Sequence, residues 1–203
     1  MMNTKESTQN IEQEAKEAVR WILKSWLKAG YQAIGWHPYT DKDGNFLYAK
    51  ARIKHPKKDG KVITPISQKP DGSGFVNREP PFEMGKKPLY RLHKLVAANP
   101  DAAVFVVEGE NCVEALEGIG ELATTSGGAN SANSVDWTPL AKRKVAIWPD
   151  NDTAGRMYAN QVSQILLQLG CDVSIVDVDK IGVPERGDFV DWIKSMEAHD
   201  AKR

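Results

Sequence analysis

Four short apolar runs in the second half of the chain constrain its fold more than any other feature. They fall at residues 103–107, 122–125, 145–148 and 173–176, and helical patterns lie between several of them. Runs of this length that are apolar on both faces are typical of strands buried in a parallel sheet. The alternation of strands and helices therefore predicts an α/β domain with a parallel sheet flanked by helices.

The N-terminal segment, residues 1–32, has the pattern of one amphipathic helix. Apolar residues recur at helical spacing from Ile11 to Leu27, and Gly30 follows as a C-terminal stop. We expect this helix to precede the remaining structure as a separate element.

A small β-rich region is predicted at residues 33–87. Its β-prone runs at residues 46–53 and 62–66 are accompanied by two Asp-Gly turn dipeptides, which favour an antiparallel meander. Residues 67–88 are rich in Pro, Gly and Lys, which predicts a loop or linker without regular structure. The α/β domain is accordingly expected at residues 88–203.

Bulk composition excludes several classes of protein. No apolar run among the 203 residues approaches the roughly 18 residues that a membrane helix requires, so no membrane partner is expected. The N-terminus lacks a charged-then-apolar signal pattern, and Cys112 and Cys171 lie far apart, which favours a cytoplasmic protein with reduced thiols. Two cysteines and four scattered histidines also provide no zinc-ligand spacing.

A formal net charge of zero conceals two oppositely charged segments. Residues 41–94 hold 13 Lys and Arg against 6 Asp and Glu, whereas residues 95–203 hold 9 against 17. A basic segment beside an acidic one often separates substrate binding from metal binding. The charge distribution therefore predicts that the middle of the chain, rather than its C-terminal half, contacts a polyanion.

Acidic residues directly follow two of the apolar runs. Glu108 and Gly109 follow the first run, and Asp150 and Asp152 follow the third. Ligands of a doubly wound sheet bind beyond the carboxyl ends of its strands, so we expect these carboxylates to meet at one crevice. If the strand geometry continued, Asp150 and Asp152 would point the same way. Gly109 and Gly155 would allow a phosphate or backbone to approach closely.

Converging carboxylates are hard oxygen ligands of the kind that Mg²⁺ takes, and Mn²⁺ is the alternative ion. The competing interpretation is purely structural. In that interpretation Asp150 and Asp152 cap the following helix, and Glu108 ends a strand in water.

These two acidic motifs resemble the TOPRIM domain of primases, topoisomerases and related nucleases, which implies a Rossmann-like core. The Glu-Gly pair at residues 108–109 and the Asp-x-Asp-x-x-Gly at residues 150–155 occur in the same order and strand context. The segments at residues 88–91 and 187–192 are similar to those that flank this domain in phage- and plasmid-type primases. The stretch from Tyr39 to Arg52 is similar to the one that precedes it.

The resemblance implies that Glu108 acts as a general acid or base at the 3′-oxygen or the leaving oxygen, while Asp150 and Asp152 hold Mg²⁺. Many bacterial primases carry another acidic residue where Cys112 stands here, so a further ligand would come from elsewhere. The candidates are Glu110, Glu114 and Asp188, with Glu108 itself also within the expected ligand set.

Several other residues are candidate contacts to phosphate or nucleic acid. Gly127 and Gly128 lie in a loop of small residues whose backbone amides could line a phosphate path, and a plain flexible loop is the alternative. Arg156 could reach a phosphate or form a structural ion pair. Two basic groups could track a nucleic-acid backbone or form an ordinary solvated surface: Lys86, Lys87, Arg91, His93 and Lys94, and Arg52, Lys54, Lys57, Lys58 and Lys61.

The activity that this pattern favours is primase-like nucleotidyl transfer on single-stranded DNA or RNA with nucleoside triphosphates. No zinc module and no GxxxxGK[ST] loop is present, so a separate helicase or replication protein could act beside it. Two alternatives stay open. Attack by water would make the same site a nuclease, and a shortened primase relative could act as a non-catalytic binding protein.

Overall fold

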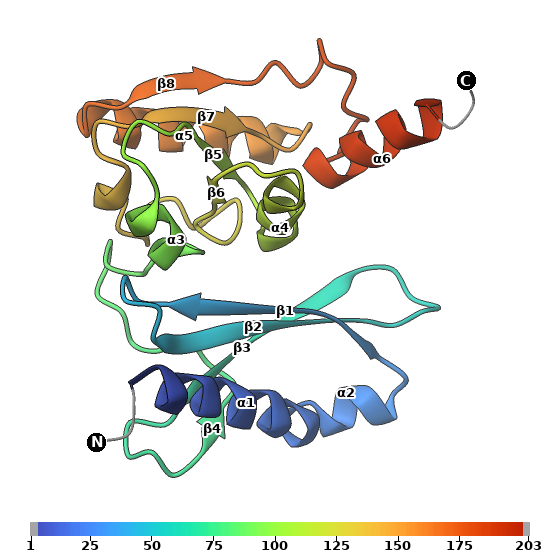
Figure 1. Cartoon of the computed structure of the whole chain (residues 1–203). Coiled ribbons are helices and arrows are strands. Elements are labelled where there is room, and N and C mark those ends of the chain that lie inside the picture. The colour runs from blue at the N-terminus through green and yellow to red at the C-terminus, as the bar shows by residue number, and fades with distance from the viewer. Residues whose placement is uncertain (1–3, 201–203) are drawn as a thin grey trace. The chain divides into compact units, whose positions relative to one another are not determined.

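The computed structural model describes residues 4–200. The chain divides into two compact units, Met1–Phe82 and Glu83–Arg203, which we call the N-terminal and C-terminal units. Figure 1 shows that each unit is built around its own four-stranded sheet. Within the described residues, no helix combines the length and apolar character needed to cross a membrane.

The N-terminal unit contains an antiparallel sheet in the order β1-β2-β3-β4, as the β-prone runs predicted. Its core joins the buried Leu23 to Ala51, Ile53 and Ile66 of the sheet. The elements are α1 (Thr4–Ile22), α2 (Lys24–Lys28), β1 (Gln32–Thr40), β2 (Phe46–Lys54), β3 (Lys61–Gln68) and β4 (Phe75–Val76). The single predicted helix is thus interrupted at Leu23.

The segment predicted as an irregular linker contains a strand. Strand β4 pairs with the end of β3, and residues 69–74 form the turn between them. The Lys69 N–H donates to the Gly74 carbonyl at 2.8 Å, and Gly72 has a φ of 72°. The turn residues that favoured a structureless linker therefore close a hairpin, because glycine supplies the left-handed backbone that such a turn requires.

The C-terminal unit confirms the predicted parallel sheet, with four parallel strands in the order β6-β5-β7-β8. Its strands are β5 (Val104–Val107), β6 (Ala123–Thr124), β7 (Lys144–Trp148) and β8 (Asp172–Ile175). Its helices are α3 (Leu92–Ala97), α4 (Glu110–Gly118), α5 (Thr153–Gln168) and α6 (Phe189–Asp200), with a short 3₁₀ turn at Thr138–Leu140. Apolar residues of β5, β7 and α5 share one buried core.

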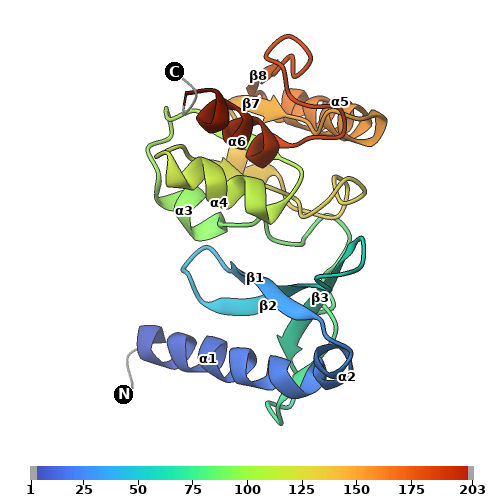
Figure 2. The same cartoon turned by 90° about the vertical axis from the view of Figure 1, so that its right-hand side faces the viewer.

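The connections of this sheet run in two directions from its centre. The chain leaves β5 through α4 to reach β6 on one side, and it leaves β7 through α5 to reach β8 on the other. Because such crossovers are right-handed, the two helices cover opposite faces of the sheet. Figure 2 shows α4 on one side of the strands and α5 on the other. The strand order therefore reverses between β5 and β7.

Candidate functional site

The point of reversal between β5 and β7 is where a doubly wound sheet leaves a crevice for ligands. In the register of these strands, Val107 is the partner of Trp148. Glu108 stands one residue beyond Val107, and Asp150 stands two residues beyond Trp148. The topology thus brings Glu108 and Asp150 to the same edge of the sheet, on neighbouring strands.

Glu108 is anchored by the strand beside it. Its carbonyl accepts a hydrogen bond of 2.8 Å from the Thr125 hydroxyl, just after β6. One oxygen of its carboxylate, Oε2, is inaccessible to solvent. The Glu108 carboxylate therefore belongs to the interior of the site and is not a strand end standing in water.

Tyr158 is a neighbour of Glu108 that the sequence interpretation missed, because it lies on the apolar side of α5. Its hydroxyl shares a hydrogen bond of 2.8 Å with the Ser126 hydroxyl and lies 3.5 Å from the Val107 carbonyl oxygen. Burial, with a smaller contribution from the negative charge of Glu108, raises the pKa of Tyr158 to about 12. Tyr158 is therefore a neutral phenol beside the carboxylate at neutral pH.

The end of β7 differs from the expected extended strand. The Asp152 N–H donates to the Asp150 carbonyl at 2.9 Å, which closes a tight turn directly after the strand. Asp152 is the N-cap of α5, and its Oδ1 accepts a hydrogen bond of 2.8 Å from the Gly155 N–H. The strand geometry does not continue through Asp150 and Asp152, so strand alternation does not set the directions of these two side chains.

The same turn explains the glycine of the Asp-x-Asp-x-x-Gly motif. A Cβ atom at Gly155 would lie 2.3 Å from the carbonyl oxygen of Asp150, closer than any real contact allows. Only glycine lets the first turn of α5 pack against the backbone of Asp150. Gly155 therefore serves the backbone approach that the sequence allowed, and the approaching group is the chain itself.

Asn151, between the two aspartates, is a buried residue that sequence reasoning overlooked. Its side-chain amide donates to the Val183 carbonyl at 2.8 Å, and its backbone N–H donates to the Gly187 carbonyl at 2.8 Å. The Arg186 N–H donates in turn to the Asn151 carbonyl at 2.9 Å. Asn151 thus ties the segment before α6 to the end of β7.

This connection brings Asp188 toward the same edge. Asp188 caps α6 by accepting hydrogen bonds from the Val190 and Asp191 N–H groups at 2.8 and 3.0 Å. Burial raises the pKa of the nearby Cys112 thiol, and the negative charges of Asp188 and Asp150 raise it further. Since both carboxylates act on one thiol of α4, Asp150 and Asp188 both lie near Cys112.

The basic cluster predicted at residues 86–94 is largely engaged inside the C-terminal unit. Arg91 approaches Glu114 and Glu117 at 3.4 and 3.2 Å, and Lys94 pairs with Glu117 at 2.7 Å. Lys87 is only 8% exposed, while Lys86 is exposed. Much of the positive charge expected to meet nucleic acid is therefore balanced by helix α4.

Arg156 and the glycine loop also have internal roles. The Arg156 guanidinium donates to the Asn151 side-chain oxygen at 2.9 Å and lies 3.5 Å from an Asp179 carboxylate oxygen, which is the structural alternative. Gly127 and Gly128 have φ angles of 101° and 148°. The Gly127 N–H donates to the Thr125 hydroxyl at 2.9 Å, so this amide is not a free phosphate donor.

The chemistry of the donors at this edge suits a divalent ion that arrives with phosphate. Glu108, Asp150 and Asp188 supply hard carboxylate oxygens. Across the part of the chain that the structure describes, no three His, Cys, Asp or Glu side chains form a group that could hold a metal by themselves. Mg²⁺ is commonly held by one or two carboxylates, with water and substrate phosphate completing the octahedron. The residues present fit that mode of binding.

The sequence matches no known protein-family model, and no curated protein is significantly similar to it. The topology of the parallel sheet and its two acidic motifs are accordingly the observations from which a function is proposed for this chain.

Proposed function

We propose that the C-terminal unit is a TOPRIM-like centre that carries out primase-like nucleotidyl transfer on single-stranded DNA or RNA. The observation that carries this proposal is the reversal of strand order between β5 and β7, with Glu108 and Asp150 directly beyond the two strands. Ligand crevices of such sheets lie at this point. The resemblance of both acidic motifs to the TOPRIM domain supports the same assignment.

In the proposed reaction, a 3′-hydroxyl attacks the α-phosphorus of a nucleoside triphosphate. A new phosphorus–oxygen bond forms, the bond to the bridging oxygen breaks, and pyrophosphate leaves. Glu108 would accept the proton of the attacking hydroxyl, since its carboxylate follows β5 directly and its backbone is held by the Thr125 hydroxyl. Tyr158 keeps its own proton at neutral pH, so it would not compete with Glu108 for the proton of the hydroxyl.

Asp150, with Asp152 or Asp188, would hold Mg²⁺ or Mn²⁺ at the other side of the crevice. When bound, such an ion neutralises charge on the phosphate oxygens. The capping bonds of Asp152 and Asp188 fix the orientation of these side chains at helix N-termini. Positioning and charge neutralisation are the main contributions to phosphoryl transfer, so rigid carboxylates suit the reaction.

The proposal extends to the cellular setting that the sequence suggests. The two cysteines, Cys112 and Cys171, are both free and buried, which supports a reducing, cytoplasmic compartment. A separate helicase or replication protein would supply the single-stranded template.

The test is an extension assay with labelled single-stranded template, all nucleoside triphosphates and Mg²⁺ or Mn²⁺. Glu108→Gln and Asp150→Asn should each reduce product formation about 100-fold or more, because the first removes the proposed proton acceptor and the second a proposed ligand of the metal ion. The matched control is Asp172→Asn. Asp172 is an exposed aspartate at the start of β8, at the opposite edge of the parallel sheet, and its loss should leave activity unchanged.

Other outcomes of this assay select the alternatives. Shortened strands that depend on Glu108 and Asp150 would identify a nuclease built on the same site. An absence of any product from the parent protein with either ion would overturn the catalytic proposal and leave a non-catalytic binding protein.

A further inference from the structure

The hairpin between β2 and β3 carries a group of lysines that the proposed catalytic centre does not use. We call Lys54, Lys57, Lys58 and Lys61 the hairpin cluster, and all four residues are exposed. Lys54 and Lys61 are direct partners across the two strands. Like charges in directly opposite positions destabilise a sheet, so this arrangement carries a cost within the free protein.

The lysines of the hairpin cluster differ from the other basic residues in their ion pairing. Among the residues whose side chains the structure describes, no carboxylate lies within ion-pair distance of these four lysines. Asp59, at the tip, is the only acidic residue between Phe46 and Gln68. This differs from Arg91 and Lys94, whose charges meet Glu114 and Glu117. The cluster therefore presents positive charge that no ion pair among the described side chains neutralises.

An aromatic side chain is held beside these lysines. The Lys58 ammonium lies 5.9 Å from the centre of the Tyr31 ring, and the Trp26 ring packs edge-on against the same tyrosine at 4.7 Å. The His55 ring lies 5.2 Å from Tyr31 and so fastens the tip of the hairpin to it. Trp26 nevertheless exposes 39% of its surface. A partly open indole thus stands next to the hairpin cluster.

We propose that the hairpin cluster and Trp26 form a binding surface for single-stranded nucleic acid. The lysines would contact successive phosphates, and the indole would stack on an unpaired base. A single strand is favoured over a duplex, because the bases of a duplex are already stacked and their faces are covered. The inference rests on the proposed function only in taking nucleic acid as the substrate, since binding by this surface requires neither a metal nor the carboxylates.

The first experiment measures binding of the full chain to a fluorescent oligothymidylate by anisotropy, in EDTA and without nucleotides. Four phosphate contacts predict a slope of about −2.8 for the logarithm of affinity against the logarithm of salt concentration. Lys57→Glu/Lys58→Glu should weaken binding at least about tenfold at low salt and reduce that slope to about −1.4. Equal affinity of this variant and the parent would overturn the proposal.

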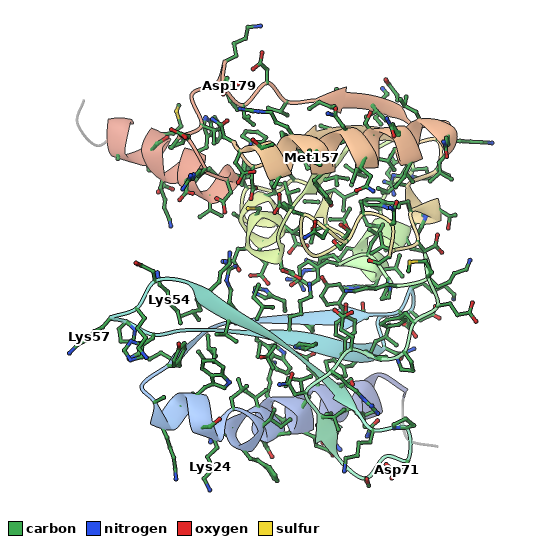
Figure 3. The ribbon with its side chains drawn as sticks, turned by 180° about the vertical axis from the view of Figure 1, so that it is seen from behind. Lys24, Lys54, Lys57, Asp71, Met157 and Asp179 are labelled. Carbon is green, nitrogen blue, oxygen red and sulfur yellow. The ribbon has the colours of Figure 1, made fainter. Side chains whose placement is uncertain are left out.

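The matched control is Lys24→Glu, which reverses an exposed charge in the same unit. Figure 3 shows Lys54 and Lys57 near the end of the hairpin, with Lys24 extending from α2 in another direction. At about 0.1 M salt the affinity of Lys24→Glu should stay within about twofold of the parent value, because the Debye length is then about 10 Å and more distant charges are largely screened. If Lys24→Glu lost as much affinity as Lys57→Glu/Lys58→Glu, the loss would be a general charge effect and would contradict a localised site.

A second variant separates stacking from charge. Trp26→Leu should weaken binding at least about fivefold while leaving the salt slope unchanged, because stacking involves no counterion release. Unchanged melting temperatures of Trp26→Leu and Lys57→Glu/Lys58→Glu would exclude unfolding as the cause of weaker binding. Tighter binding to duplex DNA, to phosphatidylserine vesicles or to polyglutamate than to the single strand would show that single-stranded nucleic acid is not the preferred ligand, and would overturn the proposal.

The hairpin proposal and the catalytic proposal fail in distinguishable ways. Binding that depends on the hairpin cluster, without any nucleotidyl transfer, would retain the surface and remove the catalytic function. Extension activity together with cluster variants that bind normally would support the catalytic function and contradict the binding surface.

Discussion

The charged residues of the two units differ in how far the fold depends on them. In the C-terminal unit, Asp152 and Asp188 cap helices, and Arg91 pairs with two glutamates. In the N-terminal unit, Lys54 and Lys61 stand opposite each other in the sheet with no carboxylate partner among the described side chains. Removing charge should therefore cost stability in the first unit and increase it in the second.

This difference decides how mutational data are to be interpreted. A carboxylate that caps a helix and also faces the candidate site changes both stability and activity when it is replaced. A lysine of the hairpin cluster changes binding while the fold is retained. Variants that preserve one role and remove the other therefore separate effects on stability from effects on activity or binding.

The largest loss of stability is expected where the backbone of Gly155 packs against that of Asp150. Gly155→Ala should destabilise the protein by about 3 kcal/mol, because the new methyl group meets the Asp150 carbonyl and the turn must move. Helix propensity alone predicts the opposite sign, a gain of up to about 1 kcal/mol. Urea denaturation followed by circular dichroism measures the difference.

Gly118→Ala is the matched control for this substitution. Gly118 is also a helical glycine, at the end of α4, and a Cβ there would have no neighbour within 4 Å. It should be neutral or slightly stabilising. If both alanine variants were equally stable, close packing against Asp150 would not explain the glycine of the motif.

A smaller loss is expected at the helix cap. Asp152→Ala removes the acceptor of the Gly155 N–H and should cost about 1 kcal/mol, whereas Asp152→Asn retains a capping oxygen and should cost little. The extension assay measures the catalytic activity of the same variants. Asp152→Asn removes the charge, so a loss of activity with normal stability would assign Asp152 a role at the metal beyond capping, and full activity would restrict it to the cap.

The smallest change in stability is a gain, and it is expected in the N-terminal unit. Lys54→Glu places an acid opposite Lys61 and should stabilise the protein by about 0.5 kcal/mol at low ionic strength. Salt near 1 M should remove most of the gain, since the Debye length falls to about 3 Å. A loss of stability at low salt would mean that the cross-strand repulsion is relieved in some other way.

The sequence predicted the elements whose periodicity and composition agree. Apolar runs located all four parallel strands, and the helix that follows Asp152 begins at Thr153 as expected. The antiparallel meander was visible from β-prone runs and turn dipeptides. Strand β4 was missed because it is only Phe75–Val76 and lies among turn residues, where local composition outweighs a two-residue pairing.

The candidate site was predictable in outline and not in detail. The order of the acidic motifs and their strand context brought Glu108 and Asp150 to one edge by topology alone. The contacts that hold this edge together were not visible, because Tyr158 read as an apolar helix residue and Asn151 as part of an acidic run. Both make hydrogen bonds to segments about 30 residues or more away.

The sequence by itself determined the parallel sheet, the two acidic motifs and the uneven distribution of charge, because periodicity, strand order and composition are local properties. Only the tertiary structure decided which charges are compensated. Arg91 meets Glu114 and Glu117 because helices α3 and α4 bring them together, whereas the hairpin lysines meet one another across two strands. Ion pairing depends on distances of a few ångströms between distant segments, and local patterns do not encode these distances.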